Sequence, residues 1–332
     1  MMDIAISSAT RTPSDFYALG AVSATGLSRP VVSCTLATIC LVFLSSGVVA
    51  QEDGDNSLDH ILTTADNWPI HVTYLESPKG KESPVVVLLT AANGDQKLTV
   101  TRRVWTDLAT HLQKNGFAVL SVDLRKHGDS MPEGDIGKKQ KRVRLVDYRN
   151  MVLGDMEAVK AFLLDLHEKQ KLNIRKTAIV SSGASGLVGA AFALNDWNKR
   201  PYDDAPRFED RTPRGQDVRV IVMFSPRKTR GFNTARILRP LRDPRWQIAF
   251  RFYHSSEDKS EAKFAKKLFE LVDLKGEQYD ELRSIEAASV SAEGFLEGRV
   301  GKAVQEDLAQ FLKTHLTELP SPWRSRTSAL DK

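Results

Sequence analysis

The stretch that decides the fold is TAIVSSGASGLVGA, residues 177–190. Its first half is apolar and β-branched, which predicts a buried strand, and its second half is rich in small residues, which predicts a closely packed helix. Ser185 lies at the break between the two, beside Gly183 and Gly186, whose backbones can turn tightly and approach their neighbours. We therefore expect a serine hydroxyl where a buried strand gives way to a helix.

Strand and helix patterns alternate over most of the chain. Residues 62–75 alternate apolar and polar side chains about Asn67, as two antiparallel strands do. A strand followed by a helix and another strand implies a parallel pair with a crossover. The pattern therefore predicts an α/β fold, a single domain of about eight mostly parallel strands with helices on both faces. The further expected strands are 84–91, 117–124, 177–182, 217–226, 246–254 and 282–291, and the expected helices are 105–112, 152–166, 186–197, 261–272 and 301–316.

The first 50 residues differ from the rest of the chain. They end in an apolar segment with small residues before the polar QEDGDNS, which is the pattern of a secretory signal cleaved after Ala50. The apolar core of about 15 residues is short for a membrane span, and an uncleaved membrane anchor is the alternative. We expect export to the periplasm, the cell envelope or the outside, a folded domain at 51–319 and a frayed polar tail at 320–332.

Composition excludes several kinds of site. Both cysteines, Cys34 and Cys40, lie in the N-terminal segment, so the exported domain has no thiol for a disulfide, a thiolate metal site or a nucleophile. The carboxylates have no zinc or calcium spacing and no P-loop is present, so neither a metal nor another cofactor is expected. The net charge of +5 fits contact with an anionic envelope polymer. The basic stretch GKKQKRVRL at 137–145 lacks interleaved aromatic residues, so no nucleic-acid partner is expected.

Three segments give the chain a resemblance to the α/β-hydrolase superfamily over nearly all of residues 60–316. DLRKHGDS at 123–130 resembles the family's turn after the fourth strand, and IVSSGASG at 179–186 is similar to its nucleophile elbow. FYHSSEDKSEAKFAKKL at 252–268 is similar to the strand and turn that carry the catalytic acid. The resemblance implies the α/β-hydrolase fold and, for a complete site, serine-dependent hydrolysis of a small-molecule ester or acyl substrate.

By position, the resemblance makes Ser185 the nucleophile and the N–H of Gly186 an oxyanion donor. The second oxyanion donor would come from the loop after the third strand, TAANGDQ, where Ala91 lies. The acid would be Glu257 or Asp258, and spacing does not decide between them.

The catalytic base is the missing part. The family's histidine should lie in the loop AEGFLEGRVGK, residues 292–302, which contains no histidine. Without a base nothing takes the proton of the serine as it attacks, so the hydroxyl is a poor nucleophile. His254, at the end of an expected strand, is a candidate relocated base, although a histidine there can also bond only locally. Ser185 can equally serve as a cap of the following helix, and Leu187 replaces the second glycine of the usual elbow.

The sequence thus favours an exported protein of the α/β-hydrolase fold whose Ser/His/acid triad is incomplete, and which acts by binding or with vestigial activity. A serine hydrolase that uses Ser185 and the relocated base His254 is the first alternative. A protein that binds an envelope polymer through its basic loop is the second, because fold alone does not decide function.

Overall fold

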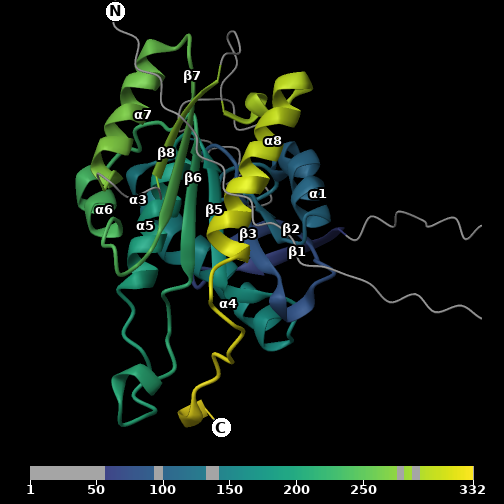
Figure 1. Ribbon diagram of the computed structural model, residues 1–332, viewed down its shortest axis with the longest axis vertical. Coiled ribbons are helices and arrows are strands. Elements are labelled where there is room, and N and C mark those ends of the chain that lie inside the picture. The colour runs from purple at the N-terminus through teal and green to yellow at the C-terminus, as the bar shows by residue number, and fades with distance from the viewer. Residues whose placement is uncertain (1–56, 93–99, 132–141, 275–279, 286–291, 332) are drawn as a thin grey trace, which may run out of the picture. The chain divides into compact units, whose positions relative to one another are not determined.

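The computed structural model describes residues 57–92, 100–131, 142–274, 280–285 and 292–331. By its internal contacts the chain from Gly54 to Lys332 forms one compact unit. Its described residues contain an eight-stranded sheet in the order β1-β2-β4-β3-β5-β6-β7-β8 (Figure 1). The strands are β1 (Ser57–Thr63), β2 (Pro69–Leu75), β3 (Pro84–Leu89), β4 (Ala118–Val122), β5 (Asn173–Ser182), β6 (Val218–Phe224), β7 (Ala249–Ser255) and β8 (Asp280–Ile285).

The first two strands form the antiparallel pair that the alternating pattern predicts. β1 pairs with β2, and β2 pairs antiparallel with β4. Asn67 between them has a φ of +58°, in the left-handed region that asparagine tolerates better than most residues. All other neighbouring strands pair in parallel. The two predicted antiparallel strands and the turn at Asn67 are therefore confirmed.

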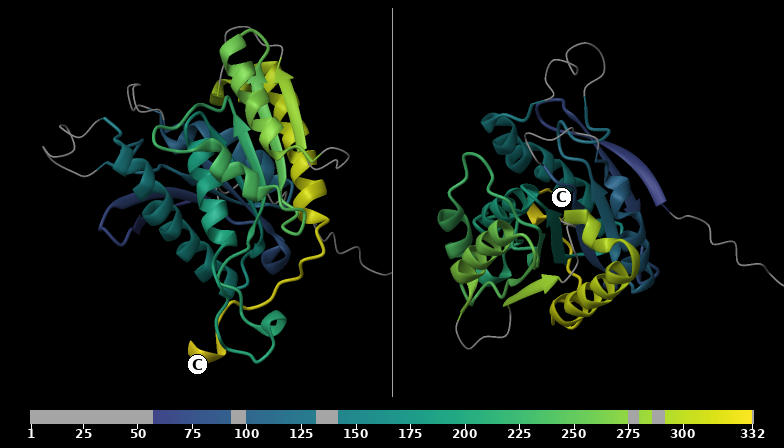
Figure 2. Two further views of the ribbon diagram at one scale, coloured as in Figure 1. Left: turned by 90° about the vertical axis from the view of Figure 1, so that its left-hand side faces the viewer. Right: turned by 90° about the horizontal axis from the view of Figure 1, so that it is seen from above.

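Helices cover both faces of the sheet, as the two views of Figure 2 show. Alternate residues of a strand face opposite sides, so Val86 and Leu88 of β3 join one apolar cluster and Val85 and Val87 the other. The first cluster includes residues of α1 and α8, and the second includes residues of α4, α5, α6 and α7. The α-helices of the described residues are α1 (Thr106–Lys114), α3 (Leu145–Asn150), α4 (Met156–Glu168), α5 (Ser185–Trp197), α6 (Thr234–Leu241), α7 (Lys259–Val272) and α8 (Gly298–Leu312).

This architecture confirms the predicted fold class, a doubly wound and mostly parallel sheet in one domain. Two local features differ from the prediction. The helix expected at 152–166 is α4 preceded by α3, and the two are joined by a π-helical turn at Met151–Asp155. α6 was not predicted, because its eight residues contain a proline and two arginines and only three of its side chains are buried.

The C-terminal tail is docked onto the domain, so the prediction that it is frayed was wrong. Trp323 donates its indole N–H to the carbonyl oxygen of His167 at 3.0 Å, and the guanidinium of Arg326 forms a buried ion pair with Asp217. The Ser328 hydroxyl donates to Asp204 at 2.9 Å, in the charged loop before β6. A buried cation must be paired, and this pairing holds the tail in place.

The predicted leader at residues 1–50 and most of the basic stretch, residues 137–141, lie outside the described residues. None of the helices in the described residues has the length and hydrophobicity that a membrane crossing needs. Within the same residues, no group of three or more His, Cys, Asp or Glu side chains is arranged to hold a metal ion.

Candidate functional site

The strand-to-helix elbow is present at the carboxyl end of β5, but its turning residue is a glycine. β5 ends at Ser182 and α5 begins at Ser185. Between them Gly183 has a φ of +56°, in the left-handed region that glycine adopts without strain. Its N–H donates to the carbonyl oxygen of Phe224 at 2.9 Å, and its own carbonyl oxygen accepts from the N–H of Arg227 at 3.0 Å. The neighbouring strand β6 therefore fixes the turn at Gly183.

Ser185, the predicted nucleophile, lies two residues after the turn, in the first turn of α5. Its side chain is fully buried. The hydroxyl donates to the carbonyl oxygen of Ser182 at 2.6 Å and has a longer contact of 3.4 Å with that of Leu89. The hydroxyl is thus directed back to the end of the strand, and the assignment of Ser185 as a nucleophile stays a prediction.

Gly186, the predicted oxyanion donor, is the second residue of α5. A Cβ atom at this position would lie 3.0 Å from the sulfur of Met223 on β6, so this glycine allows the helix to pack closely on the sheet. The residue that directly follows the turn is Ala184, not Gly186.

A carboxylate from the loop after β8 binds at this end of the sheet. Glu293 lies in a short 3₁₀ helix, Ala292–Leu296, in the region where the family's histidine was expected. Its Oε1 accepts the N–H of Ala91 at 3.0 Å and also the hydroxyl of Ser182. The backbone N–H that the resemblance assigns to an oxyanion is therefore already bound to a side-chain carboxylate.

The backbone before Glu293 is held in an uncommon conformation. Ala292 has a φ of +57°, which is unfavourable for a residue with a Cβ atom. Its N–H donates to the hydroxyl of Ser225 at 2.6 Å, at the end of β6. That hydroxyl in turn donates to Glu261 at 2.8 Å. These bonds keep the loop against the carboxyl edge of the sheet.

Neither of the two candidate acids is buried at the site. Asp258 is exposed and caps α7, where its carboxylate accepts the N–H groups of Glu261 at 3.0 Å and Ser260 at 2.9 Å. The hydrogen bond from Glu261 is the main reason that the pKa of Asp258 lies below its usual value. Glu257 is also exposed. The buried carboxylate is that of Glu261, which accepts the N–H of Ser255 at 2.8 Å in addition to the Ser225 hydroxyl.

His254, the candidate relocated base, has no hydrogen bond to Ser185 among those of the described residues. It lies on β7, and β6 separates that strand from β5. The Nδ1 atom of His254 lies 2.9 Å from the carbonyl oxygen of Ser255, so within the described residues its hydrogen bonding is local.

The turn at 123–130 is a structural element. Lys126 has a φ of +66° and is buried, and its ammonium binds the carboxylate of Asp147 at 2.7 Å. His127 is buried beside it with Nδ1 2.9 Å from the carbonyl oxygen of Arg125, and burial lowers the pKa of His127. The imidazole of His127 therefore stabilises the conformation of this turn.

Sequence reasoning named Gly183 only as a glycine beside Ser185 and missed its place on the turn, and it missed Glu293 and Glu261. A signal for the first was present, because small residues flank Gly183 two positions before and two after, as Ser181 and Ser185. That spacing is the one in Gly-x-Ser-x-Gly, with glycine at its centre. No comparable signal marks the two glutamates, whose partners lie far away in the sequence.

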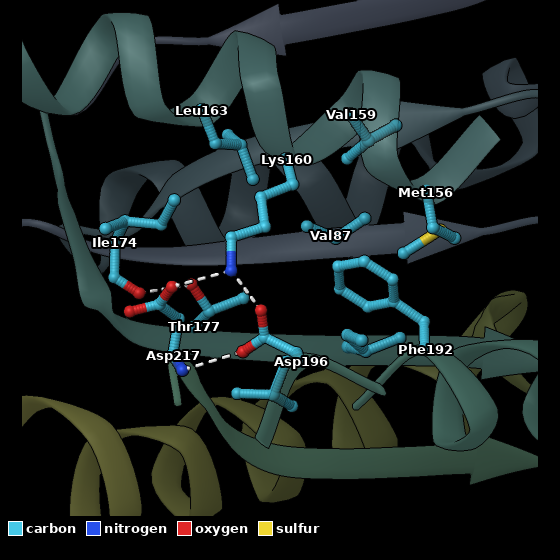
Figure 3. Close-up of a pocket in the computed structure, with 12 residues that line it drawn as sticks. Val87, Met156, Val159, Lys160, Leu163, Ile174, Thr177, Phe192, Asp196 and Asp217 are labelled. Carbon is cyan, nitrogen blue, oxygen red and sulfur yellow. Dashed lines mark hydrogen bonds and ion pairs between the residues drawn. The ribbon is translucent and has the colours of Figure 1, made fainter. Parts of the chain in front are cut away.

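A small cavity lies away from this site, between α4, α5 and the amino ends of β5 and β6 (Figure 3). Its volume of about 20 Å³ is room for roughly one water molecule. Beside it the ammonium of Lys160 pairs with Asp196, lies 3.1 Å from Asp217 and donates to the carbonyl oxygen of Arg214 at 3.0 Å. This is a buried ion-pair network that includes the tail residue Arg326, and it is too small for an ester substrate.

Comparison with known proteins gives structural matches only. No protein-family model matches the chain, and no curated protein sequence matches it. Esterase 2 of Thermogutta terrifontis, phosphorylated by paraoxon, aligns with a TM-score of 0.54 and 14% identity over 80% of this chain and 97% of that one. The 2,6-dihydroxy-pseudo-oxynicotine hydrolase aligns with a TM-score of 0.52 and 13% identity over 82% and 71%. The chain has the α/β-hydrolase fold.

At these identities the likeness concerns the fold alone. In an α/β-hydrolase the residue on the sharp turn after the central strand is the one whose side chain projects into the site. In this chain the residue with a left-handed φ directly after β5 is Gly183, which has no side chain.

Proposed function

We propose that this protein is a non-catalytic member of the α/β-hydrolase fold that acts by binding. The observation that carries the proposal is the left-handed turn at Gly183, where a hydrolase of this fold needs a nucleophilic side chain. Glycine fits the turn without strain but offers no atom for attack on a carbonyl carbon.

The carboxylate of Glu293 supports the same proposal. A tetrahedral intermediate of ester hydrolysis carries a negative oxygen, which backbone N–H groups must stabilise. The N–H of Ala91 donates to Glu293 instead, and a carboxylate beside that position would repel a second negative oxygen. The loop that should supply the base therefore supplies an anion.

The alternative is a serine hydrolase that uses Ser185 with His254 as its base. Ser185 would have to break its 2.6 Å hydrogen bond to the Ser182 carbonyl, and His254 would have to leave its 2.9 Å contact with the Ser255 carbonyl. Both movements go against buried and locally bonded side chains, so the geometry favours the non-catalytic proposal.

Export through residues 1–50 stays part of the proposal and rests on the sequence pattern. N-terminal sequencing of the protein secreted by its host should begin at Gln51. A mature chain that begins before residue 31 would contradict a cleaved signal.

Ester turnover tests the catalytic part of the proposal. Short acyl esters should be hydrolysed no faster in the presence of the full chain than in buffer alone. The same result is expected for Ser185→Ala and His254→Ala, and an active esterase is the positive control. Ester hydrolysis by the parent chain that is lost in Ser185→Ala would refute the proposal. Additional loss in His254→Ala, with an unchanged melting temperature, would establish the alternative.

A further inference from the structure

The positive charge of the chain is concentrated in one segment. Residues 226–274 contain twelve basic and six acidic residues, a net charge of +6, whereas the whole chain carries +5. The rest of the chain is therefore close to neutral. The segment forms the loop after β6, α6, β7 and α7.

α6 and α7 lie side by side against the sheet, at the left of Figure 1. Their apolar sides, with Leu238 on α6 and Leu268 on α7, are buried in the core. Their outer sides and the preceding loop carry exposed basic side chains. We call the following set the α6–α7 surface: Lys228, Arg230, Arg236, Arg239, Arg242, Lys259, Lys263, Lys266 and Lys267.

The spacing of these residues makes them neighbours in space. Lys259, Lys263 and Lys266 on α7 are four and three residues apart, so they share one side of the helix. Arg236 and Arg239 on α6 are three apart. Two adjacent helices therefore present rows of cations to the same side of the domain.

No carboxylate within the described residues lies at ion-pair distance from any member of the α6–α7 surface. Elsewhere the chain pairs its cations closely, as in Arg125 with Asp66 at 2.7 Å and Lys126 with Asp147 at 2.7 Å. Exposed acids of the same segment, such as Asp258 and Glu270, are outnumbered by these cations. Cations in excess repel one another, and an anion that binds several of them at once relieves this repulsion.

The basic stretch singled out in the sequence ends beside this surface. Leu145, its last residue, packs against Gly231, where an added Cβ atom would lie 1.7 Å from Leu145 Cδ1. Gly231 belongs to the same loop as Arg230. The described end of the basic stretch therefore lies beside this loop.

The other side chains of the segment favour one class of polyanion. The large apolar residues of the segment are buried or half-buried, and the exposed Leu145 is the apolar side chain that lies beside it. The segment itself therefore lacks the exposed apolar side chains that anchor proteins in membranes. Trp246 is stacked on Trp197 at 5.1 Å between ring centroids, and Phe264 and Phe269 pack against the core, so they do not offer rings for the bases of a single-stranded nucleic acid. A polysaccharide with regularly spaced carboxylates needs neither feature.

We infer that the α6–α7 surface is a binding site for a linear acidic polysaccharide, held by ion pairs and hydrogen bonds from its arginine and lysine side chains. The inference names a partner for the proposed binding function, but its surface contains no residue of the elbow. The inference about the α6–α7 surface can therefore be refuted without refuting the proposed absence of catalysis, and the reverse also holds.

The test is binding of the full chain to fluorescent polygalacturonate, with neutral dextran as the ligand control. We expect saturable binding at about 50 mM salt that weakens strongly at about 200 mM, because the contacts are exposed ion pairs. Dextran should not bind. Absence of binding to polygalacturonate, or binding that salt does not weaken, would overturn the inference.

Charge-matched variants separate the surface from the net charge of the protein. Replacing three lysines of α7 should weaken binding by about tenfold or more. The same loss of charge on α1, α8 and the turn after α8, which lie on the other side of the sheet, should leave it nearly unchanged. The test variant is Lys263→Gln/Lys266→Gln/Lys267→Gln, and the control is Lys114→Gln/Lys302→Gln/Lys313→Gln.

Equal weakening in the two variants would refute a defined site and leave only an effect of net charge. Tighter binding to duplex DNA or to vesicles with anionic lipid than to polygalacturonate would also refute the inference, in favour of those partners. A protein that binds polygalacturonate as expected and also hydrolyses esters would refute the proposed function and support this inference.

Discussion

At the carboxyl end of β5 the polar side chains bind one another or the backbone, whereas on the α6–α7 surface nine basic side chains have no acidic partner in the described residues. Ser182, Ser185 and Glu293 have their hydrogen bonds within the protein. A group satisfied internally must give up a bond before it can bind a ligand, while an exposed cation gives up only water. The edge shaped like an active site is thus the less available of the two regions.

The largest expected loss of stability comes from removing a buried charge. Lys160→Met removes the cation between Asp196 and Asp217 and leaves buried carboxylates without it. Breaking a buried ion pair costs about 3–5 kcal/mol, which urea unfolding would measure. The matched control is Lys169→Met, in an exposed pair with Asp165, with an expected loss of at most about 0.5 kcal/mol. Similar losses in the two variants would mean that the network is not the buried pair described.

A smaller loss of stability is expected from removing the carboxylate of Glu293 at the elbow. Glu293→Ala leaves the N–H of Ala91 and the hydroxyl of Ser182 without their acceptor, at a cost of about 1–3 kcal/mol in the free energy of unfolding. Glu293→Gln keeps an oxygen acceptor and should lose less. If both variants were as stable as the parent chain, the hydrogen bonds of Glu293 would not stabilise the carboxyl edge of the sheet.

The turn can be tested by adding the missing side chain. Gly183→Ser places a Cβ atom at a φ of +56°, which should cost about 1–2 kcal/mol. The new hydroxyl should still fail to hydrolyse esters, because no histidine of the described residues is hydrogen-bonded to the elbow and Glu293 remains bound to Ala91. Rapid ester turnover by this variant would show that the rest of the site is intact, contrary to the account.

A buried histidine gives the fold a pH dependence. Burial lowers the pKa of His127 below its ordinary 6.5, so the unfolded chain takes up the proton more readily than the folded one. Stability should therefore fall as pH drops below 6.5, by at most about 1.4 kcal/mol per pH unit from this group. His127→Asn should reduce that slope in urea unfolding between about pH 7.5 and 5.5. An unchanged slope would assign it to other groups.

The smallest effect on stability is expected at the α6–α7 surface. Arg236→Gln/Arg239→Gln/Arg242→Gln removes exposed charges that contact no acid in the described residues, so unfolding should change by no more than about 0.5 kcal/mol. Affinity for polygalacturonate is the quantity that should fall. A loss of several kcal/mol would mean that these arginines serve the fold.

Much of the fold could be predicted because buried strands and helices have recognisable patterns of apolar residues in the sequence. The parallel strands have helices on both faces and read as apolar runs, and the β1–β2 pair alternates about Asn67. α6 left a weaker trace, since arginines and Pro240 fill its short exposed side. The tail gave none, because the partner of Arg326 is Asp217, more than 100 positions away.

The site was predictable only in its location. The break between strand and helix was expected at 183–186, where it occurs, but the apolar pattern does not say which residue takes the positive φ. The contact between Glu293 and Ala91 spans 202 positions. Such pairings depend on how loops meet at the edge of the folded sheet, and local patterns do not contain that information.

The central claim is that no serine of this chain is an activated nucleophile. The most direct test is incubation of the full chain with a fluorophosphonate, followed by mass spectrometry of the intact protein and of its peptides. The account predicts an unmodified mass under conditions that label an active esterase completely. A stoichiometric adduct that maps to Ser185 would contradict it.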